Sequence, residues 1–261
     1  MDKISDALQS VRDLADSNKE LTYAFAAIGA GVVGLKLAKC LRSVYRYTIR
    51  PSHNLAKRYG DNWAVVTGAS DGIGKALAFE LASKGFKVGL VGRNQDKLEA
   101  VAKDIAEQHK VETKVVVFDF NVHYTAEKIA ELSELLGVFE KVSILVNNVG
   151  MASYNPLEKM TDENIHKQIN VNVVGTTVVS KIMIPKLRAN ENRAAMLIIA
   201  SIAAESPCPN LAVYSATKSY DYQLGLSLAQ ELKDKIDVTV VNTASVKSNM
   251  NSGRFLFTIT P

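Results

Sequence analysis

The stretch that decides the fold is WAVVTGASDGIG, which occupies residues 63–74. An apolar run of strand length leads into a glycine-rich turn, and a helical pattern follows the turn. The N-terminus of a helix attracts phosphate, because its N–H groups are unpaired and its dipole is positive there. The glycine spacing is G-xxx-G-x-G, and glycines let the backbone approach a pyrophosphate closely. The turn therefore predicts dinucleotide binding by Gly68, Ser70, Asp71, Gly72, Ile73 and Gly74.

Around this stretch, apolar runs of strand length alternate with amphipathic stretches of helix length. The runs are almost wholly apolar, as in a parallel sheet that is covered on both faces. We therefore expect an α/β fold with a doubly wound parallel sheet of the Rossmann type over residues 62–261. Strands are expected at residues 63–67, 87–91, 113–119, 143–147, 195–200 and 237–241. Helices are expected at residues 73–84, 95–109, 126–139, 161–187 and 214–233.

The end of the second expected strand indicates which nicotinamide cofactor the site prefers. Gly92, Arg93 and Asn94 follow this strand, and none of them is acidic. An acidic side chain at this place would accept hydrogen bonds from the ribose hydroxyls of NAD. Arg93 can instead pair with a 2′-phosphate through its planar guanidinium. The sequence predicts NADP(H), with a solvated surface arginine as the alternative interpretation of Arg93.

The composition excludes several classes of protein. Of the 261 residues, 47% are hydrophobic and 22% are charged, which excludes disordered and collagen-like chains. Two cysteines, Cys40 and Cys208, are too few for a disulfide scaffold, and the four histidines form no metal-ligand spacing. The net charge of +4 is too small to indicate nucleic acid as the main partner. The excess charge lies in residues 21–60, which contain no acid and carry Lys36, Lys39, Arg42, Arg46, Arg50, Lys57 and Arg58.

An uncharged run, LTYAFAAIGAGVVGL, precedes this basic block at residues 21–35. Extended to residue 41 as a helix it would span about 31 Å, which matches a hydrocarbon core of about 30 Å. We expect a polar segment at residues 1–20, a transmembrane or membrane-associated helix at 21–41 and a basic linker at 42–61. The positive-inside rule then leaves the bulk of the chain in the cytosol.

Three other interpretations of this helix compete with a membrane anchor. A secretory signal peptide would carry its basic residues before the apolar run, whereas here they follow it. A mitochondrial presequence is poor in acidic residues, whereas residues 1–20 contain five. A buried helix of a soluble fold remains the third alternative.

The motif Tyr214-Ser-Ala-Thr-Lys218 pairs a tyrosine with a lysine one helical turn later, on the same face. A tyrosine hydroxyl is a poor acid or base near neutral pH, and a nearby ammonium favours the tyrosinate. The spacing alone is not specific, because Tyr124 and Lys128 repeat it. Ser201 precedes Tyr214 by thirteen residues, at the end of an expected strand, whereas Tyr124 has no serine at that spacing. We therefore interpret Tyr124 and Lys128 as an ordinary helix face.

Taken together, these features resemble the short-chain dehydrogenase/reductases over roughly residues 60–250. The run SPCPNLAVYSATK at residues 206–218, joined to the apolar N-terminal helix, is similar to a narrower branch of that family. This branch contains the very-long-chain 3-oxoacyl-CoA reductases and related 17β-hydroxysteroid dehydrogenases of the endoplasmic reticulum. The matching motifs are Gly68, Gly72, Gly74, the Asn147–Asn148–Val149–Gly150 run, Asn172 in N-x-x-G, Ser201, Tyr214 and Lys218.

The resemblance implies NADP(H)-dependent reduction of a ketone on a lipid-like substrate, either a 3-oxoacyl-CoA or a 17-ketosteroid. Tyr214 would be the general acid, and Lys218 would support it and hold the nicotinamide ribose. Ser201 would donate a hydrogen bond to the substrate carbonyl, and Asn172 would anchor a water of the proton relay. The resemblance implies further cofactor contacts at Asp119, Asn147, Gly150, Val246 and Ser248.

The sequence departs from the family pattern near its end. Thr243 stands where many members carry proline, and the chain ends at Pro261, before the segment with which relatives usually cover the substrate. We expect a C-terminally short reductase domain. The departure also supports an alternative function, a non-catalytic cofactor-binding subunit of a membrane assembly.

The resemblance also implies partners and a location. The expected partners are a small-molecule lipid ketone or acyl-CoA substrate and a membrane, with a homodimer or a membrane complex left open and no nucleic acid. The expected location is the endoplasmic reticulum membrane with the catalytic domain in the cytosol. A mitochondrial membrane is the alternative.

Overall fold

The computed structural model describes residues 5–6, 9–11, 13, 17–49, 54–244 and 246. It divides into two compact units, Met1–His53 and Asn54–Pro261. In the first unit, helix α2 covers Lys19–Val44, and a π-helical turn at Tyr45–Ile49 continues it. The predicted anchor at residues 21–41 lies within α2.

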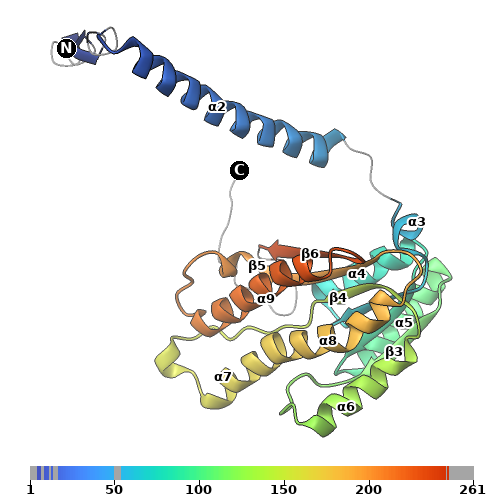
Figure 1. Ribbon diagram of the computed structural model, residues 1–261. Coiled ribbons are helices and arrows are strands. Elements are labelled where there is room, and N and C mark those ends of the chain that lie inside the picture. The colour runs from blue at the N-terminus through green and yellow to red at the C-terminus, as the bar shows by residue number, and fades with distance from the viewer. Residues whose placement is uncertain are drawn as a thin grey trace. The chain divides into compact units, whose positions relative to one another are not determined.

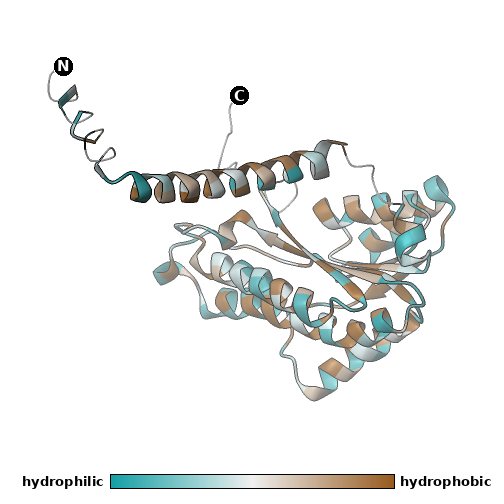
Figure 2. Cartoon of the chain, turned by 45° about the horizontal axis from the view of Figure 1, so that its top comes forward, coloured by the Kyte–Doolittle hydropathy of each residue, from teal (hydrophilic) through white to brown (hydrophobic). Residues whose placement is uncertain are grey.

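Helix α2 has the length and composition of a membrane-spanning segment. Its 26 residues correspond to roughly 39 Å of helix, and none of them is buried. Figure 2 shows apolar residues along its whole length. Large apolar side chains of the helix, such as Phe25, Ile28 and Val33, are exposed. The apolar residues surround the helix rather than forming one stripe, and this distribution suits a lipid environment better than the surface of a soluble core. The helix is a candidate membrane anchor.

The second unit is built on one six-stranded sheet in which every pair of neighbouring strands is parallel (Figure 1). The strand order is β3-β2-β1-β4-β5-β6, the doubly wound arrangement that the sequence predicts. All six predicted strands are confirmed, and their ends differ from the expected ones by at most two residues. The strands are β1 Trp63–Thr67, β2 Lys87–Gly92, β3 Thr113–Val117, β4 Val142–Asn147, β5 Ala194–Ser201 and β6 Ile236–Thr243.

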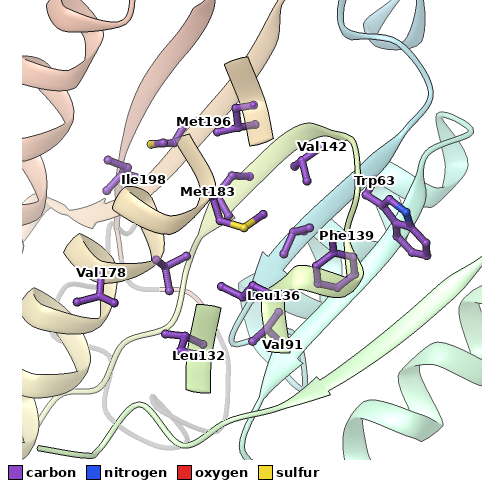
Figure 3. Packing of buried hydrophobic residues seen from close by; sticks show 14 of the residues in the cluster. Trp63, Val91, Leu132, Leu136, Phe139, Val142, Val178, Met183, Met196 and Ile198 are labelled. Carbon is purple, nitrogen blue, oxygen red and sulfur yellow. The ribbon is translucent and has the colours of Figure 1, made fainter. Parts of the chain in front are cut away.

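Helices cover both faces of the sheet, and each face has its own hydrophobic core. On one face, side chains of α6, α8 and α9 pack against the strands, and Figure 3 shows part of this core around Met183, Leu136 and Phe139. On the other face, α4 and α5 pack around Phe86, Leu90 and Leu98. The helices are α4 Gly72–Ser83, α5 Gln95–His109, α6 Ala126–Leu135, α7 Asp162–Ile169, α8 Gly175–Arg188 and α9 Ala212–Glu231.

Two predicted helices differ from the observed ones in a way that has a local cause. Helix α6 ends at Leu135 and tightens into a 3₁₀ turn at Leu136–Val138, where Gly137 disfavours a continued helix. The expected single helix at residues 161–187 is interrupted, because a π-helical turn at Asn170–Val174 separates α7 from α8. Such turns insert an extra residue into a helix and are frequent at functional sites.

A short helix, α3 at Leu55–Tyr59, occupies part of the segment that the sequence analysis assigns to a linker. Asn54 caps its N-terminus by accepting from the backbone N–H of Lys57, and Gly60 ends it with a φ of 77°. Tyr59 packs against the core, and its carbonyl accepts from the side chains of Ser143 and Asn190. Residues 54–60 are thus a fixed part of the folded unit.

Asp237 near the start of β6 holds α3 in place. Its Oδ2 accepts from Nη2 of Arg58 at 2.6 Å and from the hydroxyl of Tyr59 at 3.0 Å. Its Oδ1 accepts from Nη2 of Arg193 at 2.7 Å. Burial alone would raise the pKa of Asp237, but the hydrogen bonds from Arg193, Arg58 and Tyr59 outweigh it, and the pKa is lowered.

Candidate active site

The glycine turn between β1 and α4 has the backbone geometry that a dinucleotide phosphate requires. Gly68 and Gly72 have φ values of 66° and 54°, in the left-handed region that favours glycine. A side-chain carbon on Gly74 would overlap the carbonyl of Gly68 and the side-chain amide of Asn148. The first turn of α4 therefore lies directly over the turn, with its N-terminal N–H groups at the carboxyl edge of the sheet. These residues fit a bound dinucleotide.

The strand order reverses between β1 and β4, and side-chain hydrogen bonds join the ends of these two strands. The hydroxyl of Thr67 donates to the carbonyl of Val146 and accepts from the N–H groups of Asn148 and Val149 at 3.0 and 3.1 Å. The amide of Asn148 returns a bond of 2.9 Å to the carbonyl of Thr67. Doubly wound sheets bind their ligands at such a switch point. These hydrogen bonds hold the ends of β1 and β4 in place at the switch point.

Asn147 lies at the end of β4 and is 3% exposed. Its Nδ2 donates to the hydroxyl of Ser180 on α8 at 2.9 Å, and Ser180 donates in turn to the carbonyl of Thr176. Its Oδ1 is buried without a hydrogen-bond partner among the described residues. An unpaired buried acceptor costs free energy, so a donor from a ligand or an ordered water would stabilise the site here.

The π-helical turn brings Asn172 into the interior, where it is fully buried. Its Oδ1 accepts from the N–H of Met151, and its Nδ2 donates to the carbonyl of Met151, both at 2.9 Å. The same Nδ2 donates to the hydroxyl of Thr217 on α9, also at 2.9 Å. Asn172 therefore connects three segments: the loop after β4, the π turn and the helix that carries Tyr214.

Lys218 is the charged residue among the four predicted catalytic residues, and only 4% of it is exposed. Its Nζ donates to the carbonyl of Ile199 on β5 at 2.8 Å and to Oδ2 of Asp221 at 2.9 Å. A side-chain carbon on Gly150 would lie 3.4 Å from this Nζ and 3.6 Å from Oδ1 of Asn172. Lys218, Asn172 and Gly150 thus converge on one point.

Ser201 and Tyr214 lie on the elements that flank this point. Ser201 is the last residue of β5, and its Oγ accepts from the N–H of Ala203 at 3.2 Å. Tyr214 lies in the first turn of α9, and its carbonyl accepts from the hydroxyl of Thr217. The hydroxyl of Ser215 donates to the carbonyl of Ala203 at 2.7 Å, which fixes the start of α9 against the end of β5.

The remaining predicted cofactor residues have different surroundings. Arg93 is exposed after the end of β2, beside Asn94, which caps α5. Asp119 is exposed beyond β3, and its Oδ1 accepts from the N–H of Asn121 at 2.9 Å. Val246 is 39% exposed, whereas Ser248 lies outside the described residues. Ser70, Asp71 and Ile73 are partly buried in the glycine turn.

The second Tyr-x-x-x-Lys motif has a different environment. Tyr124 precedes α6 rather than lying on it, and its hydroxyl donates to the carbonyl of Phe120 at 3.1 Å. Burial raises the pKa of Tyr124, and the negative charge of Asp119 raises it further. Lys128 points to Glu131, with 2.6 Å between Nζ and Oε2. The contacts of Tyr124 and Lys128 hold local structure.

Sequence reasoning missed the residues that support the predicted ones. Thr67 carried a signal, because it is the polar last residue of an apolar strand immediately before a glycine. Asp221 carried another, since it is an acidic residue one helical turn after Lys218, on a helix that must pack against a sheet. Thr217 and Ser180 carried none, because hydroxyl side chains are common on any helix.

Comparisons with known proteins show the family to which the chain belongs. Residues 62–256 match the sequence profile of the short chain dehydrogenase family, and the chain belongs to that family. The chain is 38% identical over 240 residues to a very-long-chain 3-oxoacyl-CoA reductase of Podospora anserina, covering 90% of this chain and 69% of the relative. It is 39% identical over 184 residues to the inactive hydroxysteroid dehydrogenase-like protein 1 of Homo sapiens, covering 70% of this chain and 54% of the relative.

Solved structures show the same fold. A short-chain dehydrogenase from Sphingobium yanoikuyae in complex with NADPH superposes with a TM-score of 0.67 and 26% identity, and the match covers 73% of each chain. The family resemblance that the sequence motifs indicate is therefore confirmed.

Proposed function

We propose that the chain is an NADP(H)-dependent reductase of a ketone on a lipid-like substrate, with a 3-oxoacyl-CoA favoured over a 17-ketosteroid. The observation that carries the proposal is the convergence of Lys218 and Asn172 beside Gly150, at the carboxyl edge of a doubly wound sheet. The 3-oxoacyl-CoA is favoured because several relatives at 34–38% identity bear the name of a reductase of that substrate class.

The cofactor would lie across the switch point between β1 and β4. Its pyrophosphate would meet the glycine turn, which comprises Gly68, Ser70, Asp71, Gly72, Ile73 and Gly74. Arg93 would pair with the 2′-phosphate, since its position after β2 offers a guanidinium and no carboxylate. Further contacts would come from Asp119, Asn147, Gly150, Lys218, Val246 and Ser248. When bound, NADPH would supply the hydride that reduces the carbonyl carbon.

The chain's own residues would manage the proton. Ser201 would donate a hydrogen bond to the carbonyl oxygen, and Tyr214 would give this oxygen its proton as the hydride reaches the carbon. The product is an alcohol, which has gained one hydride and one proton. The ammonium of Lys218 would stabilise the tyrosinate that remains. Asn172 has one acceptor position left on Oδ1 for a water that returns the proton.

A membrane location completes the proposal. Helix α2 would anchor the chain, and the basic residues that begin at Lys36 would stay on the cytosolic side. The endoplasmic reticulum is proposed as the membrane, with a mitochondrial membrane as the alternative. Such an anchor keeps the reductase beside substrates whose long acyl chains partition into lipid.

The direct test is oxidation of NADPH by the full-length protein in detergent or vesicles, with 3-oxoacyl-CoA substrates of increasing chain length and with 17-ketosteroids. We expect turnover on the acyl-CoA series and a preference for NADPH over NADH. A preference for NADH would contradict the role of Arg93. Turnover on the steroids alone would contradict the favoured substrate.

A second candidate is a non-catalytic, cofactor-binding subunit of a membrane assembly. The observation in its favour is the 39% identity to a human relative whose name calls it inactive. NADPH binding without turnover on any of these ketones, together with stoichiometric isolation in a membrane complex, would favour this second candidate.

A further inference from the structure

Lys218 and Asp221 form a buried ion pair one helical turn apart on α9. Their side chains are 5% and 1% exposed, and 2.9 Å separate Nζ from Oδ2. Among the described residues, Lys218 forms an ion pair with Asp221 and with no other carboxylate. Removing two charges from water is costly, so a pair this deep must be held by good geometry or serve another purpose.

The geometry around the pair is well defined. An ammonium has three donors, and Lys218 uses one on Asp221 and one on the carbonyl of Ile199. These two bonds hold Nζ between β5 and α9 and leave a third donor for a ligand. The other carboxylate oxygen, Oδ1 of Asp221, is buried without a hydrogen-bond partner among the described residues. Asp221 therefore determines where the ammonium of Lys218 lies.

The carboxylate also changes the local charge. An isolated ammonium one turn from Tyr214 would favour the tyrosinate strongly, whereas an adjacent carboxylate offsets part of that effect. Burial raises the pKa of Asp221, and the charge of Lys218 opposes that rise.

We propose that Asp221 is a positioning residue, which holds the ammonium of Lys218 one helical turn from Tyr214 and offsets part of its charge. The part that concerns catalysis rests on the proposed function, but the placement of the ammonium does not.

The neighbouring elements contribute few other ionisable groups. Strand β5 and the π turn contribute none, because AAMLIIAS and NVNVV contain no ionisable side chain. On α8 the hydroxyl of Thr176 lowers the pKa of Asp221, Lys181 and Arg188 are exposed, and Lys186 donates to the carbonyl of Phe139. Besides the pair itself, the titratable side chains on α7, directly after β5 and on α9 are Asp162, Glu163, His166, Lys167, Glu205, Tyr214, Tyr220, Tyr222 and Glu231. The carboxylate of Glu205 bonds to the amide of Asn242, and the hydroxyl of Tyr220 bonds to Thr177.

The test is a spectroscopic titration of Tyr214 in the full-length protein without cofactor. Tyrosinate absorbance is recorded against pH, and the same titration of Tyr214→Phe is subtracted to isolate one residue. In Asp221→Asn, the loss of a negative charge favours proton loss from its neighbours. We expect the midpoint of Tyr214 to fall by about one pH unit. Glu231→Gln is the matched control, because it removes an exposed carboxylate from the same helix. The midpoint of Tyr214 in Glu231→Gln should equal the midpoint in the unmodified protein.

If Asp221→Asn does not fold, Thr176→Val is titrated instead. This variant keeps the volume but removes a hydroxyl that lowers the pKa of Asp221, so a smaller shift in the same direction is expected. An unchanged midpoint, or one that rises, in whichever variant folds would overturn the proposal.

A kinetic measurement separates this proposal from the proposed function. If the protein reduces ketones, the fall of kcat at high pH should also move to lower pH in Asp221→Asn but not in Glu231→Gln. A shifted titration without any turnover would support the role of Asp221 and contradict the reductase. Turnover with an unshifted titration would support the reductase and contradict the role of Asp221.

Discussion

The side-chain amide of Asn172 donates a hydrogen bond to the hydroxyl of Thr217 over 2.9 Å, and this bond ties the π-helical turn to helix α9. The same side chain holds both backbone polar groups of Met151. Asn172→Ala would leave these buried groups without partners. We expect it to lower the free energy of unfolding by about 2–4 kcal/mol. The measurement is denaturant unfolding. Asn155→Ala is the control because Asn155 is exposed, and the unfolding midpoint of this variant should equal that of the unmodified protein.

Tyr214→Phe removes the proposed acid without changing the shape of the side chain. We expect turnover to disappear while NADPH binding, measured by the quenching of protein fluorescence, persists. Tyr124→Phe is the matched control, since Tyr124 starts the other Tyr-x-x-x-Lys motif and bonds only to a backbone carbonyl. It should retain turnover. Substantial activity in Tyr214→Phe would remove the proposed mechanism.

Gly74→Ala places a carbon where the carbonyl of Gly68 and the amide of Asn148 already lie. The turn must shift to accommodate it, which costs about 1–3 kcal/mol of stability. We expect the Kd for NADPH to rise by about tenfold or more. Gly137→Ala adds the same carbon in open space, away from the glycine turn, and should leave the Kd for NADPH unchanged. Equal NADPH affinity in both variants, measured by isothermal titration calorimetry, would show that the turn does not hold the cofactor.

Asp237→Asn weakens the bonds that fix α3 to β6. Since the pKa of Asp237 is lowered in the folded state, its contribution to stability is complete above the unfolded value of about 3.9 and declines as the pH falls below it. We expect the variant to lose about 1–2 kcal/mol at neutral pH, with solvent screening of the arginines included. The difference from the unmodified protein should shrink on acidification, as followed by urea unfolding at several pH values. Glu191→Gln breaks an ion pair with Lys141 in which the carboxylate is 83% exposed, so its effect should be much smaller.

Ile28→Lys combined with Val32→Lys places two charges near the middle of α2. Each charge at the centre of a membrane helix costs about 2.5–3.5 kcal/mol on insertion scales. We expect the double variant to leave the membrane fraction on alkaline carbonate extraction, whereas the unmodified chain stays. Val138→Lys with Leu157→Lys changes two exposed apolar side chains of the folded unit, and it should remain membrane-bound. Extraction of the unmodified chain would exclude the anchor.

Much of the fold could be predicted from the sequence because its signals are local. Each strand is a short apolar run bounded by a turn, so the β1 and β2 predictions needed only periodicity and glycines. The glycine turn could also be predicted locally, since the spacing of Gly68, Gly72 and Gly74 after an apolar run is enough to indicate it. Helix α3 was not predicted within the linker, because Asn54, the residue that caps it, is one polar residue among many polar neighbours.

The support of the site could not be predicted in the same way. The bond from Asn172 to Thr217 spans 45 residues, and the bond from Thr67 to Asn148 spans 81. Their partners are hydroxyls and amides that occur everywhere in the chain. Asp221 could be read as near Lys218 from its spacing, but its burial depends on the packing of α9 against the sheet.

The π-helical turn at Asn170–Val174 makes the length of this segment matter as well as its residue types. Its five residues advance the chain about as far around the axis as four residues of an α-helix, so the turn absorbs one extra residue and leaves the faces of α7 and α8 in place. Inside the turn, the extra residue decides which side chain reaches Met151 and Thr217. Removing one residue would therefore restore an ordinary helix between α7 and α8, but it would change the side chain that ties this segment to α9.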